Sequence, residues 1–119
     1  MSKPVRVLLV GEAQEAFNML NTIVGGQLAH GKTNSEEIQL LKSIKQKTEL
    51  IKQNPFYGDN IPKNRIPKQL NVTNLWRAEL TNYWRMLYVI RGDNIEIVCF
   101  ILQIIDHPTY DKLFGYRKK

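Results

Sequence analysis

Two arginines and a glutamate stand close together in the last third of this 119-residue sequence: Arg77, Glu79 and Arg85. An arginine guanidinium is planar and permanently charged, and its paired N–H groups match the oxygen atoms of a phosphate. Two such groups close together could bind a backbone phosphate of a nucleic acid. The simpler alternative is a surface ion pair between Glu79 and Arg85, worth about 0.2–1 kcal/mol.

Alternating apolar and polar residues over 74–80 and 84–91 predict two β-strands that carry these side chains. A two-residue turn between the strands would mix apolar and polar residues on both faces. A three-residue turn over 81–83 instead pairs Glu79 with Arg85 and collects the even-numbered residues on the core face. This register predicts that both arginines and the glutamate stand together on the other, solvated face.

Charge is distributed unevenly along the chain, whose formal net charge is +6. Residues 1–41 have a net charge of −1, whereas residues 42–119 have a net charge of +7. A surface with charge of one sign attracts polyanions and steers their approach. The charge therefore suits a nucleic-acid partner, although an excess of lysine also simply keeps a small domain soluble.

Apolar residues at helical spacing predict two consecutive amphipathic helices in the first half, which would form a hairpin laid on a sheet. The second helix is predicted to begin at a capping box, either Thr33 with Glu36 or Asn34 with Glu37. The predicted order is β-α-α-β-β-β-α. The elements are a strand over 4–10, helices over 12–29 and up to Gln53, strands over 74–80, 84–91 and 95–105, and a short helix from Pro108 to Gly115.

The connections carry signals of their own. Residues 54–73 include three prolines and a glycine and show no apolar period. A loop of this length within a compact domain is usually functional or disordered. In the turn after the first of the two paired strands, Asn82 is the residue that best tolerates the left-handed conformation.

Several kinds of chemistry have no support in the sequence. His30 and His107 are the only histidines, and no spacing of histidine, cysteine and carboxylate residues resembles a metal site. Cys99 lies within an apolar strand, where we expect a buried packing residue. The N-terminal segment is too short for a signal peptide or a membrane span, so we expect a cytoplasmic protein without a metal or small-molecule cofactor.

Residues 76–80 and 84–88, which read Trp-Arg-Ala-Glu-Leu and Trp-Arg-Met-Leu-Tyr, resemble the RelE/ParE toxin superfamily. In that superfamily an aromatic, basic strand leads through a short turn into a Tyr-Arg-x-x-Tyr-like strand, an apolar strand and a basic, aromatic C-terminal segment. The resemblance covers essentially the whole chain. It implies one α+β domain, residues 1–119, in which a helical hairpin packs on a curved, four-stranded, largely antiparallel sheet.

The ribonuclease branch of that superfamily cuts messenger RNA, typically in the ribosomal A site, and the RNA's own 2′-OH attacks the adjacent phosphate without a metal ion. The resemblance implies that Arg85 holds the transition-state phosphate and that Arg77 binds phosphate as well. Tyr110 and His107 occupy the place of the superfamily's C-terminal acid–base and base-stacking residues. A core aromatic and a helix N-terminus are the alternative interpretation of these two residues.

Glu79 departs from the superfamily, whose members often have a second cation at this position. It is either an acquired general base or a group that neutralises Arg85 and marks lost activity. The resemblance also implies contacts with the backbone of messenger or ribosomal RNA. The basic residues assigned to these contacts are Lys63, Arg65, Lys68, Arg91, Lys112 and Arg117.

The expected function is that of the toxin in a type II toxin–antitoxin pair, a metal-independent endoribonuclease. Its expected partners are messenger RNA on the ribosome and a cognate antitoxin protein. Two alternatives stay open. One is a non-catalytic member of the fold that binds RNA or a protein through the same basic face, and the other is a ParE-like inhibitor of DNA gyrase.

Overall fold

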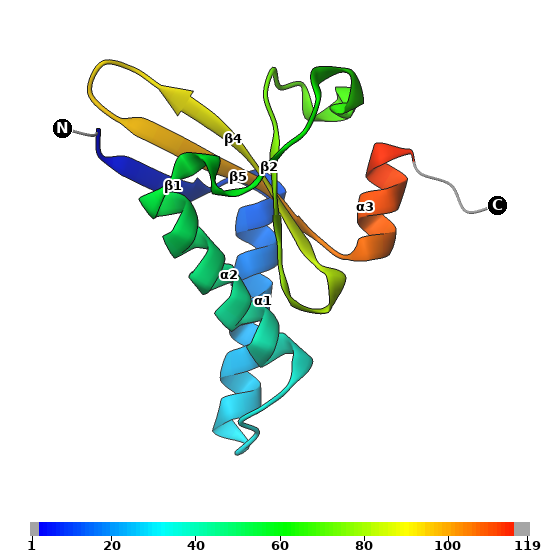
Figure 1. The fold of residues 1–119 in the computed structure, drawn as a ribbon. Coiled ribbons are helices and arrows are strands. Elements are labelled where there is room, and N and C mark those ends of the chain that lie inside the picture. Colours follow the sequence, from blue (N-terminus) through cyan, green and yellow to red (C-terminus); the bar gives the residue numbers. More distant parts are fainter. Residues whose placement is uncertain (1–2, 116–119) are drawn as a thin grey trace.

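The computed structural model describes residues 3–115 and has the predicted α+β architecture, with the main elements in the predicted order (Figure 1). The strands are β1 (Val5–Leu9), β2 (Asp59–Asn60), β3 (Trp76–Glu79), β4 (Arg85–Gly92) and β5 (Ile97–Ile105). The helices are α1 (Gly11–Ala29), α2 (Glu36–Gln53) and α3 (His107–Phe114), with 3₁₀ turns at Pro55–Tyr57, Lys63–Arg65, Lys68–Leu70 and Thr81–Tyr83.

The strands form one mixed sheet in the order β1-β5-β4-β3-β2. β1 runs parallel to β5, and the other neighbouring pairs are antiparallel. The sequence predicts four strands, and the structure adds the two-residue β2 within the predicted loop. The predicted register is confirmed, because Glu79 pairs with Arg85 across β3 and β4. Residues opposite one another share a face, so this pairing places Arg77, Glu79 and Arg85 on one side of the sheet.

The hairpin of α1 and α2 covers the other side, and Figure 1 shows the two helices running side by side away from the sheet. The core beneath them contains even-numbered residues of β3 and β4, among them Ala78, Met86 and Tyr88, as the alternating pattern predicts. From α2 it receives Ile44 and Ile51. Among residues 3–115, no helix is long and apolar enough to cross a membrane.

The capping residue of α2 is Ser35, which differs from both pairs that the sequence predicts. Its hydroxyl accepts a hydrogen bond from the backbone N–H of Ile38 at 3.0 Å and donates one to the side chain of Gln27 in α1. Gln27 in turn donates to Glu37 at 2.9 Å. The start of α2 is thus fixed by a contact across the hairpin. The predicted glutamates lie in the first turn, where their negative charge interacts favourably with the helix dipole.

The side of the sheet that carries the arginines is not solvated along its length, which corrects the expectation from the sequence. Leu75, Leu87 and Val89 are buried there in a second apolar cluster. Side chains of α3 and of residues 61–72 pack against them. The polar side chains on this side are therefore flanked by apolar packing rather than standing on an open sheet.

Residues 54–60, here called the strap, run along the edge of the sheet and are held by one buried side chain. The Tyr88 hydroxyl accepts a hydrogen bond from the Gly58 N–H at 2.9 Å and donates one to the Pro55 carbonyl oxygen at 2.8 Å. A Cβ at Gly58 would lie only 2.6 Å from a carbonyl oxygen of β3, so this close approach requires glycine. Burial raises the pKa of Tyr88 to about 12, which keeps its donor in place. The strap thereby positions Asp59 beside β3.

Cys99 lies within β5 and has no exposed surface. Burial raises the pKa of its thiol to about 11, so the reactive thiolate is scarce at neutral pH. Cys99 is therefore the packing residue that the sequence predicts.

Candidate functional site

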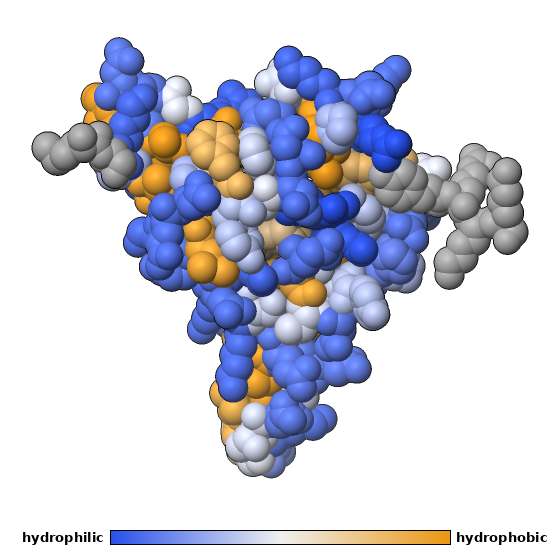
Figure 2. Space-filling model, in the orientation of Figure 1, coloured by the Kyte–Doolittle hydropathy of each residue, from blue (hydrophilic) through white to orange (hydrophobic). Residues whose placement is uncertain are grey.

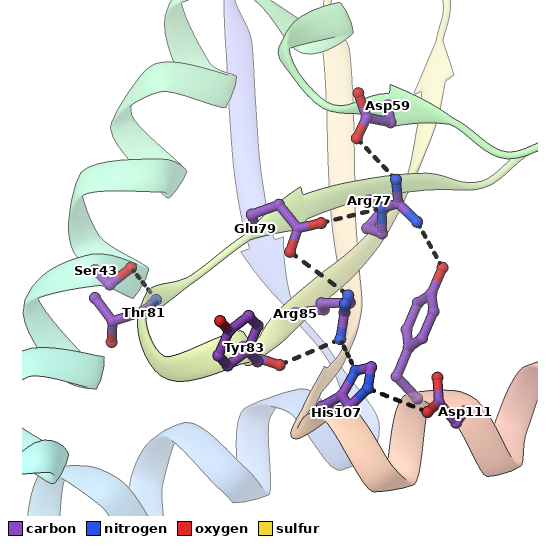
Figure 3. A network of polar contacts seen from close by, with 10 residues as sticks. Ser43, Asp59, Arg77, Glu79, Thr81, Tyr83, Arg85, His107 and Asp111 are labelled. Atoms are coloured by element: carbon purple, nitrogen blue, oxygen red, sulfur yellow. Dashed lines mark hydrogen bonds and ion pairs between the residues drawn. The ribbon is translucent and has the colours of Figure 1, made fainter. Parts of the chain in front are cut away.

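The two arginines and the glutamate lie together on the side of the sheet opposite the helical hairpin (Figure 3). The Glu79 carboxylate is shared between them: Oε1 is 3.6 Å from Nε of Arg77, and Oε2 is 3.5 Å from Nε of Arg85. Both contacts are ion pairs that are too long for good hydrogen bonds. The side chain of Glu79 is 53% exposed, against 29% for Arg77 and 13% for Arg85. Solvent thus reaches the carboxylate more readily than the guanidinium groups.

Arg77 joins three elements of the fold. Its Nη1 donates to the Tyr110 hydroxyl of α3 at 2.9 Å, and its Nη2 donates to Asp59 of β2 at 3.0 Å. Burial alone would lower the pKa of Arg77, but the bonds to Tyr110 and Asp59 and the nearby Glu79 carboxylate raise it above its ordinary value. The guanidinium is therefore a fixed positive charge in a fixed orientation.

Arg85 is held by the turn before it and by α3. Its Nη1 donates to the Tyr83 carbonyl oxygen at 3.2 Å and to Nδ1 of His107 at 2.8 Å, and its Cζ lies 4.5 Å from the ring centre of Tyr110. A guanidinium can only donate, so Nδ1 of His107 is the acceptor, and the neutral ring carries its proton on Nε2. That atom lies 3.2 Å from Oδ2 of Asp111.

Tyr110 is only 3% exposed. Its ring stacks on Phe114 with ring centres 4.4 Å apart and receives the Arg85 guanidinium, while its hydroxyl accepts from Arg77. A ring engaged in this way is not open to a nucleotide base. The structure thus favours the alternative interpretation of Tyr110, a core aromatic, and gives it the task of orienting both arginines.

Two buried donors of the site, Nε of Arg77 and Nε of Arg85, have no hydrogen-bond acceptor within residues 3–115. Both lie near the Glu79 carboxylate. A buried N–H without an acceptor costs free energy, and such groups are rare unless a ligand or water completes them. An anion with several oxygen atoms that enters beside Glu79 would provide the acceptors.

The charge of the cluster differs from the basic patch that the sequence suggests. The two guanidinium groups pair with the carboxylates of Asp59 and Glu79, and a third carboxylate, that of Asp111, contacts His107. Asp59 and Asp111 reach the site from the strap and from α3, outside the two alternating strands. The resting site is therefore nearly balanced in charge, and an incoming phosphate has to displace carboxylate contacts.

The structure does not bring the other predicted RNA-binding residues into this cluster. Arg91 lies on β4 six residues beyond Arg85, which is about 20 Å along an extended strand. Arg117 lies outside the described residues. The remaining four are exposed elsewhere, with Lys63, Arg65 and Lys68 on 3₁₀ turns and Lys112 on α3.

Three residues of the site are absent from the sequence prediction: Asp59, Asp111 and Tyr83. Asp59 lies in the aperiodic stretch, where no local pattern points to it. Asp111 follows His107 by four residues in a predicted helix, a spacing that places both on one helix face and could have been used. Tyr83 lies within the predicted turn over 81–83, and no pattern in the sequence assigns it a place in the site. Within residues 3–115, no group of three His, Cys, Asp or Glu side chains could hold a metal ion.

A second surface feature lies on the helical hairpin. Met19, Ile23 and Leu28 of α1 are 67%, 43% and 53% exposed. Met19 and Ile23, but not Leu28, line a groove of about 300 Å³ between the two helices and the turn that joins β3 to β4, and Glu36 and Glu37 are also among its lining residues. Figure 2 shows apolar surface on the lower part of the hairpin.

The mixed sheet, the helical hairpin and the C-terminal helix together are similar to the fold of a solved toxin structure, in agreement with the fold that the resemblance in sequence implies. One solved structure with this similarity is a YoeB/ParE toxin from Agrobacterium tumefaciens, with a TM-score of 0.58. The match covers 86% of this chain and 98% of that chain at 12% sequence identity, a level at which the similarity is one of fold. No protein-family model and no curated protein matches the sequence.

Proposed function

We propose that this chain is the toxin of a type II toxin–antitoxin pair and that it cleaves messenger RNA without a metal ion. The observation that carries the proposal is the convergence of Arg77, Arg85, Glu79 and His107 on one side of the sheet. Together they can bind a phosphate, take a proton from a 2′-OH and protonate a leaving oxygen. The fold shared with a YoeB/ParE toxin supports the same assignment.

Arg85 and Arg77 bind the scissile phosphate. Their Nε–H groups lack acceptors and are buried beside the same carboxylate, so one phosphate that displaces the Glu79 contacts can receive a hydrogen bond from each. The pentacovalent transition state carries more negative charge than the bound phosphate, and the two guanidinium groups that already contact this phosphate stabilise the added charge. Arg85 contributes more than Arg77, because its more deeply buried charge is less screened by water.

Glu79 is the general base, the first of the two roles that the sequence leaves open for it. Its half-exposed carboxylate lies within 3.6 Å of both arginines and therefore beside any phosphate they bind. It takes the proton of the 2′-OH, the 2′-oxygen bonds to phosphorus, and the bond from phosphorus to the 5′-oxygen breaks. The products are an RNA that ends in a 2′,3′-cyclic phosphate and an RNA that begins with a 5′-OH.

His107 is the general acid, and its contacts couple its protonation to substrate binding. In the resting site Arg85 donates to Nδ1, which keeps this atom unprotonated. When a phosphate draws the Arg85 guanidinium toward itself, Nδ1 can take a proton. Asp111 and the phosphate then stabilise the imidazolium, which gives its proton to the leaving 5′-oxygen.

The exposed side chains of α1 and the adjoining groove support the second part of the proposal, an antitoxin protein as partner. Contiguous apolar surface on a small protein marks an interaction site. Glu36 and Glu37 at the groove favour a partner segment with basic residues beside its apolar ones. An antitoxin that also reaches the arginine cluster would keep the site from binding RNA.

The test is induced expression in bacterial cells, followed by sequencing of RNA 5′ ends. We expect growth arrest and new 5′-OH ends within the codons of translated messages. Arg85→Ala should relieve the arrest and remove the new ends. Arg6→Ala is the matched control, because Arg6 also lies on this sheet and pairs with a glutamate, Glu96 in the turn before β5, but is outside the cluster.

Each other outcome counts against the proposal in its own way. Arrest with intact RNA and damaged DNA would replace RNA cleavage by inhibition of gyrase. Absence of both arrest and cleavage would leave a non-catalytic binding protein. Equal loss of activity in Arg6→Ala and Arg85→Ala, with both variants folded by circular dichroism, would remove the arginine cluster from the account.

A further inference from the structure

Tyr83 has the most exposed aromatic side chain within residues 3–115, at 75%, and it lies in the turn beside the arginine cluster. Its φ of +63° is a left-handed conformation that bulky residues rarely adopt. Asn82 before it is left-handed as well, with φ of +54°. A large apolar ring displayed to solvent on a strained backbone is a local conflict of the kind that clusters at functional sites.

The strained turn directs Tyr83 toward the site. Its carbonyl oxygen accepts the hydrogen bond from Nη1 of Arg85 at 3.2 Å, and its ring centre is 6.3 Å from that of His107, with the ring planes at 54° (Figure 3). A nucleotide carries its base next to its own phosphate. A phosphate held at Arg85 therefore places a neighbouring base within reach of the exposed Tyr83 ring.

We infer that Tyr83 forms a nucleobase subsite, in which its ring stacks on a base of single-stranded RNA next to the phosphate bound by Arg85. The inference deepens the proposed function and rests on it. Proteins bind single-stranded nucleic acid through aromatic platforms combined with positive charge, and stacking accepts every base because each has a π-face. Tyr110, the ring that the sequence suggests for this task, is buried, so Tyr83 is the ring that a base can reach.

The experiment measures the binding of short single-stranded oligoribonucleotides by fluorescence anisotropy. The probes carry 2′-O-methyl groups throughout, so that they cannot be cleaved, and each member of a series lacks the base at one position. For the wild-type protein we expect one position at which removal of the base weakens binding about 5- to 150-fold, the range for one stacked base.

Three variants separate the ring from its backbone. Tyr83→Phe keeps a stacking ring and should keep the sensitive position. Tyr83→Gly suits the left-handed backbone, so it removes the ring without adding strain, and it should bind the complete probe as weakly as the wild type binds the probe without that base. Ile95→Ala is the control, because Ile95 is 76% exposed in the turn between β4 and β5, and its affinity should equal that of the wild type.

The outcomes distinguish this inference from the function on which it rests. A sensitive position that persists in Tyr83→Gly overturns the nucleobase subsite and leaves the proposed function intact. Equal affinity of the wild type and Tyr83→Gly for the complete probe also overturns the nucleobase subsite and leaves the proposed function intact. The exposed ring would then be assigned to contact with a protein partner. Failure of the wild-type protein to bind any probe, together with intact RNA in cells, overturns both.

Discussion

Two arginine–glutamate contacts stand on the same side of the sheet at its opposite ends, and they are built differently. Arg6 of β1 forms a two-point pair with Glu96, with Nε 3.1 Å from Oε2 and Nη2 2.8 Å from Oε1. Its side chain is 56% exposed. Arg85 is much more buried, at 13%, shares its glutamate with a second arginine, and lies 3.5 Å from the Glu79 carboxylate.

The difference lies in what each arginine can still bind. The two-point pair directs one edge of the Arg6 guanidinium at Glu96 and leaves no donor of that edge for a phosphate. At the other end, Nη1 of Arg85 donates to Tyr83 and His107, and the two Nη atoms of Arg77 donate to Tyr110 and Asp59. The buried Nε donors of both arginines have no acceptor within residues 3–115. An exposed pair adds about 0–1 kcal/mol to stability. The Arg6 guanidinium is thus fully engaged by its glutamate along one edge, whereas the Arg85 end keeps buried donors for the phosphate of the proposed function.

The largest expected difference between the two ends is in RNA cleavage. Glu79→Gln keeps the shape of the side chain but removes the base, so we expect cleavage to slow by about 100- to 10,000-fold, the usual worth of a positioned acid or base. Glu96→Gln should leave the rate unchanged. Single-turnover cleavage of ribosome-bound message by the two purified variants makes the comparison, and equal rates would dismiss Glu79 as the base.

The next largest difference is in stability. Arg77→Ala removes a charged hydrogen bond from the buried Tyr110 hydroxyl together with the link to the strap, and should lower the free energy of unfolding by about 1–3 kcal/mol. Arg6→Ala should lower it by at most about 1 kcal/mol. Urea unfolding curves with an unchanged slope measure both values. A smaller loss of unfolding free energy for Arg77→Ala than for Arg6→Ala would contradict the conclusion that Arg77 is held more strongly than Arg6.

The third prediction concerns the pH dependence of stability at the site end, where Asp106 caps α3. Asp106 accepts a hydrogen bond from the Thr109 N–H at the start of α3. Hydrogen bonds from the side chain and the backbone of Thr109 hold the pKa of Asp106 below its ordinary value of about 3.9. Asp106→Ala should cost about 1 kcal/mol at neutral pH.

The sign of the pH effect follows from the lowered pKa. The contribution of the Asp106 carboxylate is complete above the ordinary pKa and is lost as the pH falls through the lowered one. Asp106→Asn, which keeps an acceptor without a titrating group, should lose less stability on acidification than the wild type. Unfolding free energies measured from neutral to acid pH check this, and parallel curves for the two proteins would refute it.

The smallest expected effect is on RNA affinity. The carboxylate of Asp59 is 64% exposed and occupies Nη2 of Arg77, where it competes with a phosphate. Asp59→Asn should therefore tighten the binding of a non-cleavable RNA by up to about 5-fold, the equivalent of one exposed ion pair. Asp93→Asn is the control, because Asp93 lies in the turn between β4 and β5 and accepts the N–H of Glu96, the partner of Arg6; its affinity should be unchanged. Weaker binding by Asp59→Asn would mean that this carboxylate positions Arg77 rather than shielding it.

The paired strands and their register were predictable, because they depend on local signals. Alternation with a period of two fixes which side chains share a face, and only a turn over 81–83 keeps Glu79 opposite Arg85. The left-handed Asn82 follows from the same turn. Tyr83 shares that conformation, against the preference of its residue type, and no rule of turn chemistry points to it.

The parts that escaped prediction depend on contacts between segments far apart in the sequence. The strap follows the β3 edge because Tyr88 binds backbone groups at Gly58 and Pro55, about thirty residues earlier. Tyr110 is buried because α3 docks on the second apolar cluster, whose extent no single strand pattern reveals. For the same reason the sequence predicts a basic site, whereas Asp59 and residues of α3 bring its charge close to balance.

The most direct test of the arginine cluster uses purified protein, programmed ribosomes and two labelled messages. The first message is ordinary RNA, and the second contains one 2′-deoxynucleotide at the cut position. We predict cleavage that leaves a 2′,3′-cyclic phosphate, and we predict that the 2′-deoxynucleotide abolishes this cleavage. Arg85→Ala should slow it by about 100- to 1,000-fold, as expected for loss of a transition-state donor, whereas Arg6→Ala should leave the rate unchanged. Cleavage that survives the 2′-deoxynucleotide, or that proceeds equally fast in Arg85→Ala, would contradict these predictions.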